Sequence, residues 1–190
     1  MKVGTKSLLF GVHQVFIHPL FVLISWFKLY GRPTWRELVC IIIHDWGYFG
    51  CPNMDGHEGK RHPEKGAMIA LKLFGPDYHD LVLYHSRHYS RANGVEPSKL
   101  CWADKLSIQY EPWWLYLPRA WASGELFEYR LLAAGLNTSK LKIGFCFVPM
   151  SASHCEWYRW VQDRLIKLGT EQRGDAVPYI NPSTKIKEQS

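Results

Sequence analysis

Helix start and stop signals recur along the whole chain and restrict its fold more than any other feature. Thr34 and Glu37 have the spacing of a capping box, and so do Ser153 and Glu156. Prolines suited to a first helical turn stand at Pro19, Pro63, Pro76 and Pro97. The apolar run 143–150 is a candidate strand, but it has no obvious partner strand. We therefore expect an all-α bundle of about six to seven helices with an irregular, aromatic-rich C-terminal extension.

The same signals predict where the helices lie. The expected helices are 18–31, 34–46, 63–75, 76–94, one that begins at 97–98, 123–135 and 153–169. The Gly-rich segment 47–61 and the Trp-rich segment 112–118 fall between helices. We expect residues 1–172 to form a single domain and residues 173–190 to be a loose tail.

The chain is basic, with a formal net charge of +6 and a pI of about 9.1. That balance suits a polyanionic partner such as a nucleotide, a nucleic acid or an anionic lipid. Part of the excess lies in the expected tail, at Lys185 and Lys187, so the charge says little about a site. No specific nucleic-acid binding is predicted.

Cysteine usage and hydropathy bear on the compartment. The five cysteines form no CxxC pair, which indicates reduced thiols in the cytoplasm. Segment 7–30 is apolar, but His13, Gln14, His18 and Pro19 interrupt it before the roughly 18 residues that a membrane span needs. We interpret it as a buried helix pair, so membrane contact is the less favoured interpretation. A homo-oligomer is left open.

Several histidines and aspartates stand at or near helix starts, ends or inner faces. They are His18, His44, Asp45, His62, His85 and Asp104. Helices from different parts of a chain can aim such groups at one point. Imidazole and carboxylate ligands suit iron, manganese, cobalt, nickel or zinc. His44 and Asp45 are neighbours, about 100° apart on a helix, so they can grip one ion from two sides, or Asp45 can bridge two ions.

The order of these residues resembles that of the HD-domain superfamily of metal-dependent phosphohydrolases. The resemblance covers roughly residues 10–110 and rests on five segments: HPLFV, CIIIHDWG, HPEKGAMI, YHSRH and WADKLS. It implies an HD-domain fold with one or two divalent ions. It assigns His18, His44, Asp45 and Asp104 to the first ion. His62 and His85, with Asp45 bridging, would hold a second ion, or would face the substrate if the site is mononuclear.

The chain also departs from that pattern. Tyr48 stands where the superfamily often has Lys or Glu, and we expect it in the pocket or the core. Asp45 and His88, one turn after His85 on the same expected helix, are the candidate catalytic residues. Arg61, Lys65, Arg87 and Lys105, with Tyr48, are the candidate substrate-binding residues. Asp55 and Glu58 are loop carboxylates that could act as acid or base, or could simply be solvated.

Three functions follow from these expectations. The first is hydrolysis of a nucleotide or another small phosphorylated metabolite by metal-activated water. The second is a di-iron oxygenase of the same superfamily that cleaves a C–P or C–C bond, and oxygen uptake would distinguish it. The third is a non-catalytic membrane-associated module, suggested by the apolar N-terminal segment.

Overall fold

The structure is a computed structural model, and the residues it describes are 1–52, 54, 57–133 and 151–173. Within these residues every regular element is helical, as expected for an all-α fold. The α-helices are α1 (Val3–Phe10), α2 (Ile17–Tyr30), α3 (Trp35–Ile43), α4 (His57–Lys60), α5 (His62–Phe74), α6 (Pro76–Leu83), α7 (Arg87–Ala92), α8 (Lys99–Leu106), α9 (Trp113–Ser123), α10 (Glu125–Ala133) and α11 (His154–Arg173). Two 3₁₀ helices, η1 (Trp46–Tyr48) and η2 (Ser107–Gln109), join them. The candidate strand 143–150, the tail beyond residue 173 and Asp55 lie outside the described residues.

Local signals start and stop the helices that carry the candidate ligands. Thr34 and Glu37 form the full capping box at the start of α3. The Ser98 side chain accepts a hydrogen bond from the backbone N–H of Cys101 and so caps α8. Gly31 and Gly75 end α2 and α5 with φ angles of 78° and 93°, values that only glycine adopts at low cost.

The single helix expected at 76–94 is wrong, because α6 ends at Leu83 and α7 begins at Arg87. Ser86 has an extended backbone, and its side chain accepts a hydrogen bond from His88 N–H. This cap starts a new helix and leaves His85 in the connection between the two. The expectation that His85 and His88 share one helical face is therefore also wrong.

The C-terminal half is more regular than expected, and the helix count is higher. The Trp-rich segment is helical in α9 despite Pro118, because Tyr116, Leu117 and Ala120 pack into a buried cluster with α11. Ser123 ends α9 and does not cap the next helix, since Gly124 follows with a left-handed φ of 89°. α11 has the expected capping box of Ser153 and Glu156, but it continues past Gly169 to Arg173.

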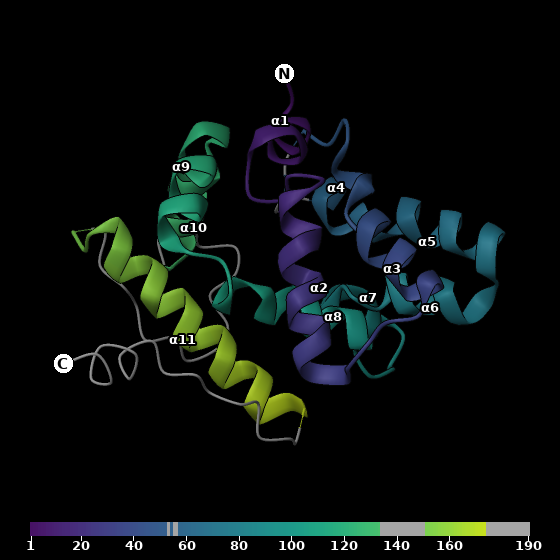
Figure 1. Ribbon diagram of the computed structural model, residues 1–190. Helices are drawn as coiled ribbons and strands as arrows, with labels where there is room; N and C mark the ends of the chain where they lie inside the picture. Colours follow the sequence, from purple (N-terminus) through teal and green to yellow (C-terminus); the bar gives the residue numbers. More distant parts are fainter. Residues whose placement is uncertain (53, 55–56, 134–150, 174–190) are drawn as a thin grey trace.

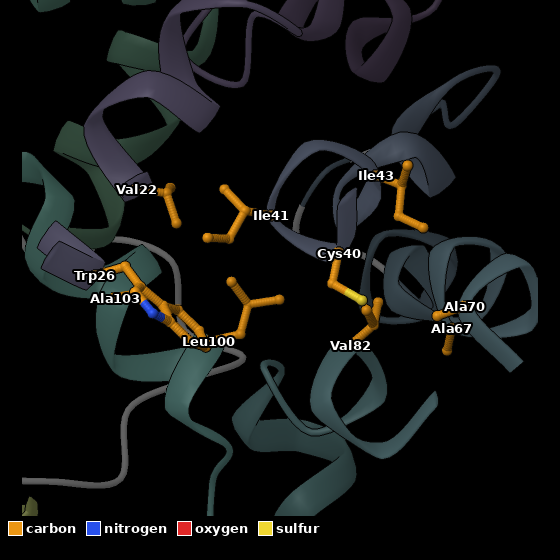
Figure 2. Packing of buried hydrophobic residues seen from close by; sticks show 10 residues of the cluster. All are labelled: Val22, Trp26, Cys40, Ile41, Ile43, Ala67, Ala70, Val82, Leu100 and Ala103. Atoms are coloured by element: carbon orange, nitrogen blue, oxygen red, sulfur yellow. The ribbon is translucent and has the colours of Figure 1, made fainter. Parts of the chain in front are cut away.

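The largest buried cluster joins α2, α3, α5, α6 and α8 (Figure 2). Its members are Val22, Trp26, Cys40, Ile41, Ile43, Ala67, Ala70, Val82, Leu100 and Ala103. These five helices are the ones that carry or adjoin the candidate ligands, so the core holds their ends in place. α2 runs through the middle of the molecule, with α5 and α6 on one side and α9, α10 and α11 on the other (Figure 1).

The structure also bears on the expected absence of a membrane span and on the expected reduced thiols. None of the described helices is both long and apolar enough to cross a membrane. In the described part of the chain Cys40, Cys101 and Cys155 are free thiols, and burial raises the pKa of Cys40 to about 12.

Candidate metal centre

Helix ends bring all six candidate ligands to one place. His18 lies in the first turn of α2, His44 and Asp45 follow the last turn of α3, and His62 opens α5. His85 follows α6, and Asp104 lies on α8. His18, His44, Asp45 and His85 are almost fully buried, with 0–6% of their surface exposed. Buried polar groups of this kind need partners, so their arrangement demands an explanation.

Three of the imidazoles are oriented by the same device. The Nδ1 atoms of His44, His62 and His85 lie 2.7, 2.7 and 2.5 Å from the backbone carbonyl oxygens of Ile41, Gly59 and Val82. A carbonyl accepts only, so each Nδ1 carries the proton and donates it. In the neutral form of each ring, Nε2 then has a lone pair that points into the cluster. This is the tautomer and the anchoring that metal-binding histidines use.

The first half of the centre surrounds one oxygen of Asp45. Asp45 Oδ2 lies 3.2 Å from His44 Nε2 and 3.4 Å from His18 Nε2. Asp104 Oδ1 lies 3.0 Å from His18 Nε2 and 3.9 Å from His44 Nε2. His18 Nε2, His44 Nε2 and Asp45 Oδ2 are nonetheless buried without an aligned hydrogen bond. A cation among these atoms would satisfy all of them at once.

The second half surrounds the other oxygen of Asp45. Asp45 Oδ1 lies 3.5 Å from His62 Nε2 and 3.6 Å from His85 Nε2. The two Nε2 atoms lie 3.0 Å from each other. Because both rings donate through Nδ1, two lone pairs face each other, an arrangement that needs a proton or a cation between them. Burial and the neighbouring His85 lower the pKa of His62 to about 3, which disfavours the proton.

The carboxylates dominate the electrostatics of the centre. Burial favours their neutral forms, yet the nearby imidazoles hold the pKa of Asp45 and of Asp104 below the usual range. Burial likewise favours neutral His44, but the charges of Asp45 and Asp104 raise its pKa to about 8. Burial lowers the pKa of His18, and Asp104 opposes that shift. The centre therefore holds two ionised carboxylates, the buried Asp45 and the half-buried Asp104, among four imidazoles, which suits divalent cations.

A second buried network adjoins the centre. The ring of His13 packs against His18, with 5.4 Å between the ring centroids, and its Nδ1 lies 3.3 Å from Glu125 Oε1. Glu125 is fully buried and also accepts hydrogen bonds from the hydroxyls of Ser7 and Ser123 and from the N–H of Val12. No sequence signal points to Glu125 as a partner of His13, because the two residues lie 112 positions apart.

Tyr48 lies at the wall of the centre. It is 8% exposed and stacks on His62, with ring centroids 4.2 Å apart and an interplanar angle of 11°. Its ring also packs against His13, at a centroid distance of 4.9 Å. These contacts place Tyr48 in the core, packed beside the candidate ligands.

The expected substrate-binding and catalytic side chains lie in different places. Arg61, Lys65 and Glu58 line a surface hollow formed by η1, α4 and α5. Arg61 is held there by Glu64, with a nitrogen–oxygen distance of 2.9 Å. Lys105 is half-buried next to Asp104, and its charge helps to lower the pKa of that carboxyl.

The two candidate residues on α7, Arg87 and His88, make other contacts. His88 is exposed and packs on Tyr89, with 5.4 Å between the ring centroids. No contact joins it to the six ligands within the described residues. Arg87 is half-buried, and burial together with Arg91 lowers its pKa.

No protein family, curated protein or solved structure matches this chain. The geometry of the centre and the chemistry of its donors are therefore the basis for a function.

Proposed function

We propose that this chain is an HD-domain metal-dependent phosphohydrolase that acts on a nucleotide or another small phosphorylated metabolite. The observation that carries the proposal is the convergence of four imidazole Nε2 atoms on Asp45, with one pair of imidazoles beside each carboxylate oxygen. Neutral imidazoles and carboxylates supplied by several helices suit divalent transition-metal ions. The order of the ligands along the chain is similar to that of the superfamily.

Two sets of residues would hold the ions. The first set is His18, His44, Asp104 and Oδ2 of Asp45, and the second is His62, His85 and Oδ1 of Asp45. The buried, unsatisfied nitrogen and oxygen atoms of the first set support a cation there. The facing lone pairs of His62 and His85 support a cation in the second. Iron, manganese, cobalt, nickel and zinc all suit these donors.

Hydrolysis of a phosphate ester forms a bond between phosphorus and the oxygen of water. It breaks the bond between phosphorus and the leaving oxygen, which takes a proton. Divalent ions in such a centre lower the pKa of water and neutralise phosphoryl oxygens. Lys105 beside Asp104, and Lys65 and Arg61 on the neighbouring hollow, would attract and orient the anionic group.

The proposal is tested by metal analysis of anaerobically purified protein, paired with phosphate release from a panel of nucleotides and sugar phosphates. We expect bound transition metal and turnover in the wild type. Asp45→Ala should lose the bound metal, and its activity should fall more than about a hundredfold, because the substitution removes an oxygen from each half of the centre. Asp163→Ala, which removes an exposed carboxylate on α11, is the matched control and should retain both. Full metal retention in a folded Asp45→Ala variant would contradict the proposal.

A second reaction is favoured by the donors themselves. Four imidazoles and two carboxylates also suit a pair of iron ions. The position where the superfamily often has Lys or Glu is occupied by Tyr48, which stacks on His62. A di-iron oxygenase that cleaves a C–P or C–C bond consumes dioxygen, whereas hydrolysis does not. Substrate-dependent oxygen uptake by the iron-loaded protein, without phosphate-ester hydrolysis, would favour this reaction over the first.

A further inference from the structure

The helix that carries His18 has a second, apolar face that is open to solvent. Phe16, at its N-terminal end, and Leu20 and Phe27 within it are 80%, 53% and 48% exposed. Their spacings of four and seven residues place them on one stripe of α2. The His18 ring lies on the buried side of the same helix. One side of α2 therefore serves the metal centre, while the other presents large apolar side chains that the described residues leave exposed.

Helix α1 extends this apolar surface. Leu9 and Phe10, at its C-terminal end, are 52% and 39% exposed. The backbone N–H of Val15 donates to the carbonyl of Leu8 over 3.0 Å, which holds the connection before Phe16 against that end of α1. We call Leu9, Phe10, Phe16, Leu20 and Phe27 the N-terminal apolar surface. Aromatic and leucine side chains that are exposed together on consecutive helices usually mark an interaction site.

The charge of this segment is one-sided. Residues 1–36 contain the five basic residues Lys2, Lys6, Lys28, Arg32 and Arg36, and the first acidic residue of the chain is Glu37. Lys2 and Lys6 share a side of α1 with Leu9, since these residues are four and three positions apart. Lys28 is exposed directly beside Phe27. The apolar surface is therefore fringed by cations that no acidic residue of the same segment neutralises.

We infer that α1 and α2 dock on the surface of an anionic lipid bilayer. The N-terminal apolar surface would enter the boundary between headgroups and acyl chains, and the lysines would lie among the acidic headgroups. A second copy of the chain fits less well, because it would bring two cationic, acid-free segments face to face. The helices would lie along the membrane and not cross it, in agreement with their length and composition.

The wild-type protein tests the choice of partner by flotation with lipid vesicles. We expect it to float with vesicles that contain phosphatidylserine and to stay behind with vesicles of phosphatidylcholine alone. Added salt should weaken the binding, because each basic residue near an anionic surface contributes about fivefold to the affinity, and salt screens that attraction. Failure to bind either type of vesicle, or equal binding to both, would overturn the inference.

Two variants of the same kind test the surface. Leu20→Asp places a charge on the apolar stripe, while Leu73→Asp makes the same change at a leucine on α5 that is 59% exposed. We expect Leu20→Asp to weaken vesicle binding about tenfold or more and Leu73→Asp to leave it unchanged. Equal losses in the two variants would contradict docking through α2.

Charge reversal gives an independent readout. The double variant Lys2→Glu/Lys28→Glu changes two exposed side chains, and we expect it to weaken binding at least about twentyfold, with its bound metal unchanged. Sedimentation velocity identifies the competing occupant. If the wild type ignores vesicles but forms a dimer that Leu20→Asp dissociates, the surface is a contact between two copies and the lipid inference is wrong. Lipid binding is independent of the reaction at the metal centre.

Discussion

At the scale of single residues, Asp45 divides the centre in two. Its Oδ2 atom faces His18 and His44, and its Oδ1 atom faces His62 and His85. One carboxylate placed between two imidazole pairs is the arrangement of a bridging ligand. Under the proposed function, substitutions on either side of Asp45 should therefore affect one ion more than the other.

The variant His62→Ala should retain about half of the bound metal, because it removes a proposed ligand from the second set only. Asp45→Ala should lose nearly all of it. Metal content per chain, measured by atomic emission after gel filtration, checks both expectations. His79→Ala is the control, because this histidine lies on α6 with its ring against the exposed Asp80. Unchanged metal content in His62→Ala would mean that His62 is not a ligand.

The six candidate ligands were predicted from the sequence, because their positions near helix signals and their order along the chain are visible without the fold. The hydrogen bonds that fix their tautomers were not visible. The acceptors of His44 and His85 are the carbonyls of Ile41 and Val82, three residues earlier, and whether such a bond forms depends on how each helix ends. The expected position of His88 on the same helix as His85 is wrong for the same reason, since Ser86 starts a new helix before His88.

At the scale of elements, close backbone packing places the ends of η1 and α5 together. A Cβ atom added to Gly47 would collide with the backbone carbonyl of His62. A Cβ atom added to Gly66 would come within 2.6 Å of the carbonyl oxygen of Ile43, at the end of α3. These glycines let three chain segments approach more closely than any side chain would permit. The approach sets the position of His62 relative to His44 and Asp45.

We predict that Gly47→Ala lowers the free energy of unfolding by about 2–3 kcal/mol and weakens metal binding in the second set, because the added methyl group must push the start of α5 away. Urea unfolding and a metal titration measure the two effects. Gly169→Ala on α11 is the matched control, since the nearest atoms to its added methyl are side-chain carbons of Leu106, at 3.0 Å and beyond. Equal stability of the two variants would show that η1 and α5 can separate without cost.

At the scale of the whole molecule, Glu125 at the start of α10 connects the N-terminal helix α1 with α9. It accepts hydrogen bonds from Ser7 on α1, from Ser123 at the end of α9 and from Tyr129 on α10. It also lies against His13, whose ring contacts His18 of the centre. Although burial opposes its ionisation, hydrogen bonds from His13, Ser123 and Ser7 lower the pKa of Glu125 to about 2.

This shift predicts a pH dependence of stability. The folded pKa of Glu125 is depressed below its ordinary value, so the stabilisation is complete above that ordinary value of 4.5 and is lost as the pH falls towards 2. We expect Glu125→Gln to cost about 3 kcal/mol at neutral pH. The difference from the wild type should shrink between about pH 4.5 and pH 3.

Urea unfolding of both proteins across this range is the measurement. Glu171→Gln, which changes an exposed carboxylate on α11, should follow the wild type at every pH. Stability curves for Glu125→Gln and wild type that stay parallel would contradict a depressed pKa.

The chain by itself determined the all-α class and most helix starts. Those properties rest on signals that act within about four residues of one another, such as the capping boxes at Thr34 and Ser153. Only the tertiary structure decided that Asp45 lies between two imidazole pairs, that Glu125 reaches His13, and that Phe16, Leu20 and Phe27 face solvent. The physical reason is that distances between helices, and the burial of each face, depend on which faces pack together, and no short stretch of sequence contains that information.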